Sequence, residues 1–115
     1  MLSDRQRGLL QDILENIGAI RRHVTHLEEL SFASFESNEL VVDAVERCLS
    51  RISEAAVKLG IEADEVAPGP QWGEIRGLGN HLRHAYHVVD LRIVWEIIED
   101  DLPPLEEACG KAVGT

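Results

Sequence analysis

Two arginines, an asparagine and a histidine recur at helical spacing in the second half of the chain. On a helix that turns by about 100° per residue, Arg76, Asn80, Arg83 and His84 fall on one face, and His87 extends that face. A guanidinium matches the oxygens of a phosphate with paired donors, and an imidazole exchanges protons near neutral pH. This face therefore predicts the binding, or the in-line cleavage, of a phosphodiester.

The alternative is an ordinary solvated face, because the apolar residues Ile75, Leu78 and Leu82 lie on the opposite side of the same helix. The distribution of charge argues against that alternative. The 115-residue chain has 11 lysines and arginines against 21 acidic residues, a net charge of −10, which excludes a broad nucleic-acid-binding surface. Residues 76–92 nevertheless hold three arginines against one aspartate. An anion site is therefore expected in this stretch.

Histidines at every third position, His81, His84 and His87, raise the hypothesis of a metal site. A third histidine six residues after the first returns only loosely to the same side of a helix, and no HExxH pattern accompanies the three. His23 and His26 form a similar pair, also without further support. We therefore expect no metal cofactor.

The remaining composition is that of one globular domain, expected over residues 1–115. The two cysteines, Cys48 and Cys109, form neither a disulfide framework nor a CxxC motif. Both lie among apolar residues and are expected as buried, reduced thiols. No apolar run approaches the roughly 20 residues that span a bilayer, and Met1 to Arg5 lack the features of a secretory signal. A cytoplasmic protein with no membrane contact is the expectation.

Apolar residues at intervals of three and four predict four helices, with no alternating pattern that would indicate a strand. The helices are expected from Asp4 to about Leu30 with Ser3 or Asp4 as cap, from Leu40 to Leu59 with Gly60 as the terminal glycine, from Trp72 to about Tyr86, and onward from Asp90 as cap. Residues 32–37 and 61–70 are expected to be connections. The predicted fold is an all-α, up-down four-helix bundle.

Two details of this bundle concern backbone geometry. Pro103 and Pro104 are expected to break or kink the last helix, because proline clashes with the preceding turn. A short terminal helix is then predicted from Leu105 to about Val113. Gly77 and Gly79 disfavour a regular helix. They indicate either a close approach by another backbone, such as a partner helix in a dimer, or a kinked helix start.

One stretch, WGEIRGLGNHLRHAY from Trp72 to Tyr86, resembles the HepT family, as do Val89-Asp90, Val94-Trp95 and the run DLPPL at 101–105. Residues 51–59 are similar to the family's second helix, so the resemblance spans nearly the whole chain. HepT proteins are HEPN-domain toxins paired with a minimal nucleotidyltransferase antitoxin, MntA. The resemblance implies a dimeric bundle that cleaves RNA without a metal at an Arg-x4-His-x-Tyr motif. It also implies silencing by transfer of AMP to the motif tyrosine.

Carried onto this chain, the motif histidine is His84, the tyrosine is Tyr86, and Asn80 stands beside the arginine position. The chain departs from the motif at that position, where it has Gly79. Arginines one turn earlier and one turn later lie on roughly the same face, so either can bring a guanidinium to the vacated space. The predicted catalytic residues are His84, Arg76, Arg83 and Asn80, and the predicted site of AMPylation is Tyr86.

The expected function is therefore an RNA endonuclease toxin that cleaves by attack of the 2′-hydroxyl and acts as a homodimer with an MntA-like antitoxin. Gly79 keeps an alternative open, in which the chain is a non-catalytic HEPN subunit that binds a nucleotide or a nucleotidyltransferase. A plain structural dimer is the third possibility. Substitution of His84 separates them, because only the first requires that imidazole for RNA cleavage.

Overall fold

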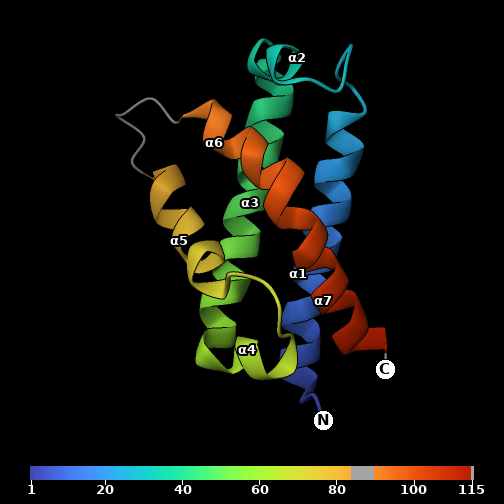
Figure 1. Cartoon of the computed structure of the whole chain (residues 1–115), viewed down its shortest axis with the longest axis vertical. Helices are drawn as coiled ribbons and strands as arrows, with labels where there is room; N and C mark the ends of the chain where they lie inside the picture. The colour runs from blue at the N-terminus through green and yellow to red at the C-terminus, as the bar shows by residue number, and fades with distance from the viewer. Residues whose placement is uncertain (84–89, 115) are drawn as a thin grey trace.

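The computed structural model describes residues 1–83 and 90–114, and all regular structure in these ranges is helical. Four long helical segments form the bundle: α1 (Asp4–Val24), α3 (Glu39–Leu59), α5 (Trp72–Arg83) and a continuous path from α6 (Leu91–Glu96) into α7 (Leu102–Gly114). Figure 1 shows α3 in the middle, with α5 on one side and α1 on the other. The predicted all-α bundle is confirmed.

Helices α1 and α3 form the central pair of the bundle. A capping box begins α1, in which the Ser3 side chain accepts from the Gln6 backbone while the Gln6 side chain accepts from the Ser3 backbone. The inward residues are fully buried, and each leucine, isoleucine and valine is worth about 1.5–3 kcal/mol of transfer free energy. They are Leu10, Ile13, Ile17 and Ile20 on α1, and Val45, Leu49, Ile52 and Ala56 on α3. The apolar spacing in the sequence predicted this face correctly.

The predicted end of the first helix was wrong. Helix α1 ends at Val24 rather than near Leu30, and the Thr25 hydroxyl donates to the Arg22 carbonyl over 2.6 Å at this end. Leu27 is nevertheless 9% exposed and belongs to the core. The apolar spacing extends past the end of α1 because Leu27, which lies in the following turn, is also buried in the core.

Both predicted connections contain short helices. Residues 32–37 form α2 (Phe32–Glu36), whose Phe35 is fully buried with its ring centroid 5.2 Å from that of Trp95. Residues 61–70 contain a 3₁₀ turn η1 (Gly60–Glu62) and α4 (Ala63–Val66). Elements this short carry too few residues for a periodic pattern, and tertiary packing holds them in place.

The end of α3 agrees with the prediction. Gly60 follows Leu59 with a φ of +63°, a left-handed conformation in which glycine has no Cβ penalty. Asp90 is also confirmed as the cap of α6, since its carboxylate accepts from the Arg92 backbone over 3.0 Å.

The prolines act differently from the prediction. Helix α6 passes through a π-helical turn η2 (Ile97–Asp101), and α7 begins at Leu102 rather than Leu105. Pro103 and Pro104 lie in the first turn of α7, where a missing N–H costs little. The helix therefore changes its winding before the prolines instead of breaking at them.

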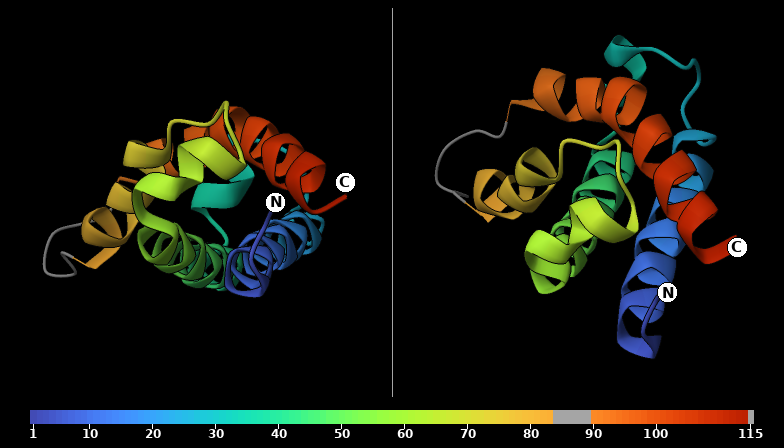
Figure 2. Two further views of the ribbon diagram at one scale, coloured as in Figure 1. Left: turned by 90° about the horizontal axis from the view of Figure 1, so that it is seen from below. Right: turned by 60° about the horizontal axis from the view of Figure 1, so that its bottom comes forward.

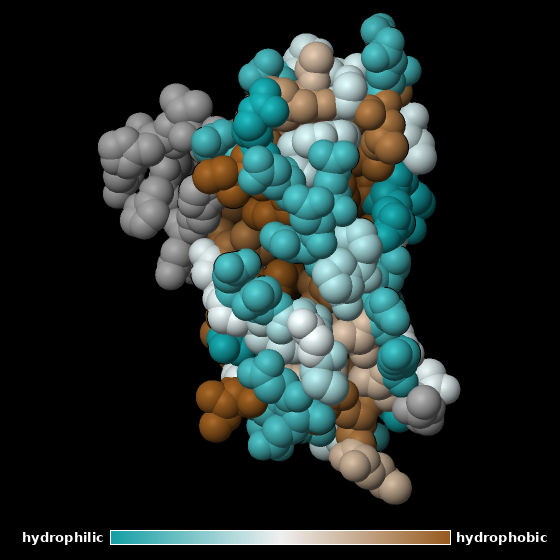
Figure 3. Space-filling view, in the orientation of Figure 1, coloured by the Kyte–Doolittle hydropathy of each residue, from teal (hydrophilic) through white to brown (hydrophobic). Residues whose placement is uncertain are grey.

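The remaining helices lie on one side of the α1–α3 pair, and the outer surface of the bundle is mostly hydrophilic in the view of Figure 3. Viewed along the bundle, α1 and α3 lie side by side while α4, α5 and the α6–α7 path gather on the same side of that pair (Figure 2). Hydrophilic residues cover most of the face drawn in Figure 3, and apolar residues show between them. Among the described residues, no helix is long and apolar enough to cross a membrane.

Candidate active site at the end of α5

Helix α5 is anchored at its beginning by the indole of Trp72. The ring is 1% exposed, and its Nε1 donates to the Ala67 carbonyl over 2.8 Å. Further along, Ile75 and Leu78 are buried and Leu82 is half-buried, as the helical spacing predicted. The apolar face of α5 therefore packs against α3 and fixes the rotation of the helix that carries the predicted site.

A second anchor is the hydroxyl of Ser53, which sequence reasoning missed. Ser53 lies on α3 with no exposed surface, donates to the Arg76 carbonyl over 2.9 Å and accepts from the Gly79 backbone over 2.9 Å. A buried hydroxyl without partners is costly, so these two bonds tie α3 to α5 one turn before the predicted motif. A serine on an otherwise apolar helix face, between Ile52 and Ala56, was the available signal.

The two glycines of α5 differ in their surroundings. Gly79 is buried, and its backbone N–H donates to the Ser53 hydroxyl on α3, while the approach of another backbone stays a prediction. Gly77 is exposed, and a Cβ built there would meet nothing within 4 Å. No contact among the described residues therefore requires glycine at position 77.

The side chain of Arg76 is directed toward the beginning of α5. Its Nη1 donates to the Gly60 carbonyl over 3.2 Å, and its Nη2 lies 4.0 Å from where a Cβ of Gly73 would stand. Gly60 caps the C-terminal end of α3, where carbonyls carry the negative end of the helix dipole. In this position the Arg76 guanidinium stabilises the end of α3.

The other predicted catalytic residues follow Arg76 along the chain. Asn80 and Arg83 belong to the last turn of α5, and Arg83 stands about 10 Å further along the helix axis than Arg76. The side chains of Asn80 and Arg83, and all of His84 and Tyr86, lie outside the described residues. The backbone therefore places Asn80 and Arg83 at the same end of α5, while the guanidinium of Arg76 lies toward the other end.

The metal hypothesis receives no further support from the part of the chain that is described. There, no three His, Cys, Asp or Glu residues form a group that could hold an ion. This covers the His23 and His26 pair, whereas the His81 side chain, His84 and His87 lie outside the described residues.

The cysteines are buried and unpaired, as predicted. Burial raises the pKa of the Cys109 thiol to about 12, so this thiol stays protonated near neutral pH. Cys109 is therefore a packing residue of α7 and not a nucleophile.

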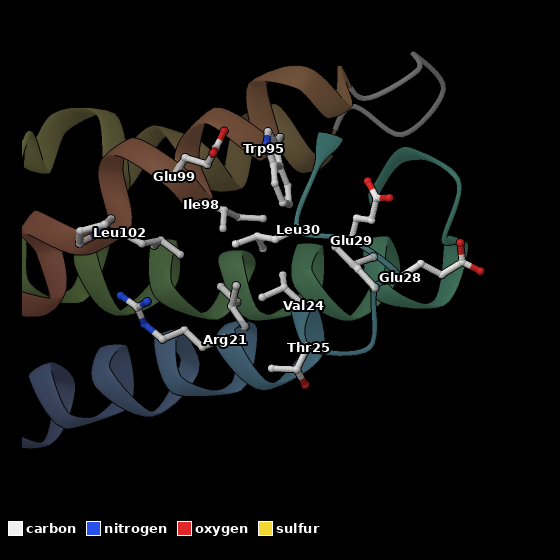
Figure 4. A pocket seen from close by; sticks show the side chains of 13 residues that line it. Arg21, Val24, Thr25, Glu28, Glu29, Leu30, Trp95, Ile98, Glu99 and Leu102 are labelled. Atoms are coloured by element: carbon white, nitrogen blue, oxygen red, sulfur yellow. The ribbon is translucent and has the colours of Figure 1, made fainter. Parts of the chain in front are cut away.

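An apolar hollow of about 600 Å³ lies elsewhere, between the end of α1, the following turn and the α6–α7 path. Figure 4 shows Val24, Leu30, Trp95 and Ile98 pointing into it from these elements. Arg76, the predicted catalytic residue whose side chain is described, does not line this hollow. The exposed lining is mainly apolar, although Arg21, Glu28 and Glu99 also border it.

Comparison with known proteins identifies the family. The family model described as HepT-like ribonuclease matches residues 13–112, which run from the first turns of α1 almost to the end of α7. The chain belongs to the HepT-like ribonuclease family. The match includes α5, the segment 84–89 and the α6–α7 path.

Individual relatives agree with the HepT-like assignment. The protein named "Probable ribonuclease HepT" of Thermococcus cleftensis is 31% identical over 100 residues, covering 87% of this chain and 88% of its own. "Putative RNase TTE0752" of Caldanaerobacter subterraneus is 33% identical over 101 residues, with 88% of each chain covered. "Putative RNase MJ1380" of Methanocaldococcus jannaschii is 29% identical over 101 residues, covering 88% of this chain and 90% of its own. No solved structure matches the chain.

Proposed function

We propose that this HepT-like protein is an RNA endonuclease that cleaves by attack of a 2′-hydroxyl on the adjacent phosphorus. The observation that carries the proposal is the family match over residues 13–112, which includes the whole stretch from Asn80 to Tyr86. The new bond joins the 2′-oxygen to phosphorus, and the bond from phosphorus to the 5′-oxygen breaks. A base removes the proton of the 2′-hydroxyl, and an acid protonates the departing 5′-oxygen.

His84 supplies one of these two proton transfers, because an imidazole exchanges protons near pH 7. The other transfer needs a second group. In a homodimer that brings two α5 ends together, His84 of each copy meets this need, one as base and one as acid. Asn80, in the last turn of α5, orients the phosphate or the imidazole. No metal ion takes part in this scheme.

Arg83 is the better of the two arginines to replace the guanidinium missing at Gly79. Arg76 is bound to the Gly60 carbonyl and folds back toward Gly73, so it would have to leave these contacts to reach the end of α5. Arg83 belongs to the same turn as Asn80 and stands next to His84 in the chain. A guanidinium there stabilises the negative charge that grows on the phosphoryl oxygens.

Tyr86 is the proposed point of control by a nucleotidyltransferase antitoxin. Transfer of AMP from ATP to the phenol oxygen releases pyrophosphate and leaves a phosphodiester two residues from His84. This negative charge competes with the RNA phosphate for the same cations. Tyr86→Phe is then expected to keep cleavage while making it insensitive to the antitoxin, which an RNA cleavage assay after preincubation with antitoxin and ATP checks.

The test of the proposed reaction is RNA cleavage in EDTA by the parent protein and by His84→Ala. Intact mass measured beforehand establishes that Tyr86 is unmodified, and circular dichroism establishes that both proteins are folded. The expected result is cleavage of RNA by the parent alone, with no cleavage of DNA. Intact RNA with the folded, unmodified parent, or cleavage of DNA, contradicts the proposal.

The second candidate function is a non-catalytic subunit that binds a nucleotide or a nucleotidyltransferase. It is favoured by one observation, that the arginine position of the motif is a glycine buried against α3. Under this alternative, His84→Ala leaves binding of the partner intact and no RNA is cleaved by either protein. Gel filtration of the parent and the variant with the partner, beside the cleavage assay, separates the two candidates.

A further inference from the structure

A second group of arginines lies on the opposite side of α3 from α5. Arg47 and Arg51 are one turn apart on α3, and Arg22 comes from the last turn of α1. Helices α1 and α3 are antiparallel, since Arg5 near the start of α1 donates to the Lys58 carbonyl near the end of α3. The end of α1 therefore lies beside the first half of α3, and this arrangement brings Arg22 to the Arg47 and Arg51 pair, which is distant from it in sequence.

Arg22 and Arg51 border an open, polar groove of about 470 Å³ between α1 and α3, and Arg47 lies one turn before Arg51 on α3. The other charged residues that line the groove are Lys58 and the carboxylates Asp12, Glu15 and Glu54. In Figure 2 the other helices gather on one side of the α1–α3 pair, which leaves the opposite side of the pair uncovered by other helices. Arg22 folds back along α1, with its Nη1 3.5 Å from where a Cβ of Gly18 would stand.

The three guanidiniums lack partners that would neutralise them. Among the described residues, no carboxylate lies within salt-bridge distance of Arg22, Arg47 or Arg51. Glu54, which also lines the groove, pairs with Lys58 over 3.3 Å. Like charges at an i,i+4 spacing oppose helix stability, so the Arg47 and Arg51 pair is unfavourable for the free protein.

The pKa of a nearby thiol, Cys48, is affected by all three arginines. Burial raises the pKa of the Cys48 thiol, while Arg51, Arg22 and Arg47 all act to lower it, which places the three around one point of the α1–α3 contact. Glu46, next to Arg47 in the chain, has its pKa raised by burial and by Asp43.

We propose that Arg22, Arg47 and Arg51 bind the phosphate backbone of single-stranded RNA at the end of the α1–α3 groove that Arg22 and Arg51 line. The inference rests on the proposed function, since it supplies a path for the substrate outside the α5 site. Phosphate is the favoured ligand because unpaired guanidiniums match its geometry. Among the described residues, no aromatic ring lines the groove on which a base could stack, so the contact is expected to hold the backbone without reading sequence.

The test is the salt dependence of binding to a short single-stranded 2′-O-methyl oligonucleotide, which the proposed reaction cannot cleave. Each phosphate contact on a single strand adds about 0.7 to the slope of log affinity against log salt. The triple variant Arg22→Gln, Arg47→Gln, Arg51→Gln is expected to lower this slope by about 2 and the affinity at low salt by about tenfold or more. A triple change to lysine retains the charges and is expected to retain the slope.

The matched control removes three positive charges that already have partners. In the parent, Arg5 donates to the Lys58 carbonyl over 2.7 Å, Arg21 pairs with Glu106 over 2.7 Å, and Lys111 pairs with Glu107 over 3.7 Å. Their change to glutamine gives the same net charge as the groove triple and is expected to leave the slope nearly unchanged. Melting temperatures of all variants verify that each is folded.

Two results would overturn the inference. Equal loss of RNA affinity in the groove triple and the control triple would show that only net charge matters. Unchanged RNA affinity in the groove triple would assign the groove to another partner, such as an acidic protein surface. His84→Ala is expected to bind the oligonucleotide like the parent, so a failure of the proposed cleavage and a failure of this inference give different results.

Discussion

The arginines of α5 and those of the α1–α3 groove are assembled in two different ways. Arg76 and Arg83 lie on one helix, and their spacing in the sequence predicts a shared face. In the structure, however, Arg76 is occupied at the end of α3. Arg47 and Arg51 share one face of α3, but Arg22 belongs to α1, and only the antiparallel packing of the two helices brings it to them.

The two groups show that the position of an arginine on a helix face does not determine whether its guanidinium is available to bind a ligand. A side chain at the right helical angle can still be taken by a neighbouring carbonyl, as Arg76 is by Gly60. An arginine with no carboxylate nearby keeps its donors for a ligand. The comparison places Arg76 in a stabilising contact, and it separates two proposed roles, Arg83 in catalysis and the groove in substrate binding.

The largest expected effect separates the two regions kinetically. Arg83→Gln is expected to lower kcat by about 10²–10³-fold, the usual cost of losing one preorganised donor to a transition-state oxyanion. The groove triple is expected to raise KM with little change in kcat, because its contacts are the same in the ground and transition states. Steady-state cleavage of a fluorescent RNA measures both constants.

Arg76→Gln is the matched variant for this experiment. It removes one charge from the same helix and is expected to leave kcat unchanged, while the free energy of unfolding falls by about 1 kcal/mol with the bond to Gly60. A loss of kcat in Arg76→Gln as large as that in Arg83→Gln would reverse the assignment of these two arginines.

An intermediate effect is expected at the buried serine that joins the two sides of α3. Ser53→Ala removes both bonds to α5 and is expected to lower the free energy of unfolding by about 1–3 kcal/mol. Urea unfolding measures the loss, and hydrogen exchange of amides at 77–83 is expected to accelerate more than that of α1. Ser50→Ala, at a half-buried serine on the same helix, is the control. Equal effects at both serines would contradict a specific role for Ser53.

The smallest expected effect concerns acidic crowding near the start of α5. Burial raises the pKa of the Asp101 carboxyl, and Glu74, Asp100 and Glu96 raise it further. The folded state therefore binds this proton more tightly than the unfolded state, whose pKa stays near the usual 3.8. Stability from this group is present at low pH and is lost as pH rises through the raised pKa.

Asp101→Asn is accordingly expected to raise the melting temperature modestly at pH 7. The gain is expected to shrink as the pH falls toward 3.8, where the native carboxyl is itself protonated. Thermal unfolding of both proteins across this range measures the change. A gain that stays constant with pH would show that asparagine acts through packing or hydrogen bonding instead of charge.

The predicted fold and the predicted site differ in how far the structure tests them. The long helices, the Gly60 terminus and the Asp90 cap are confirmed, because each depends on residues close together in the chain. The predictions that residues 32–37 and 61–70 are plain connections and that the first helix ends near Leu30 were wrong. Helix α2 is held by the contact of Phe35 with the distant Trp95, and Leu27 is buried although it lies beyond the end of α1. For the site, the position of Arg76 is described, and the roles of His84, Asn80, Arg83 and Tyr86 stay predictions.

The sequence by itself determined what local periodicity and chemical type control. These are the helical class, the apolar faces of α1, α3 and α5, the burial of both cysteines, and a stretch rich in arginine and histidine between 76 and 92. Only the tertiary structure decided which polar groups meet. Ser53 reaches α5, Arg76 reaches Gly60, and Arg22 of α1 meets Arg51 of α3 at one groove because the two helices pack antiparallel. Such contacts depend on helix packing, which no single segment encodes.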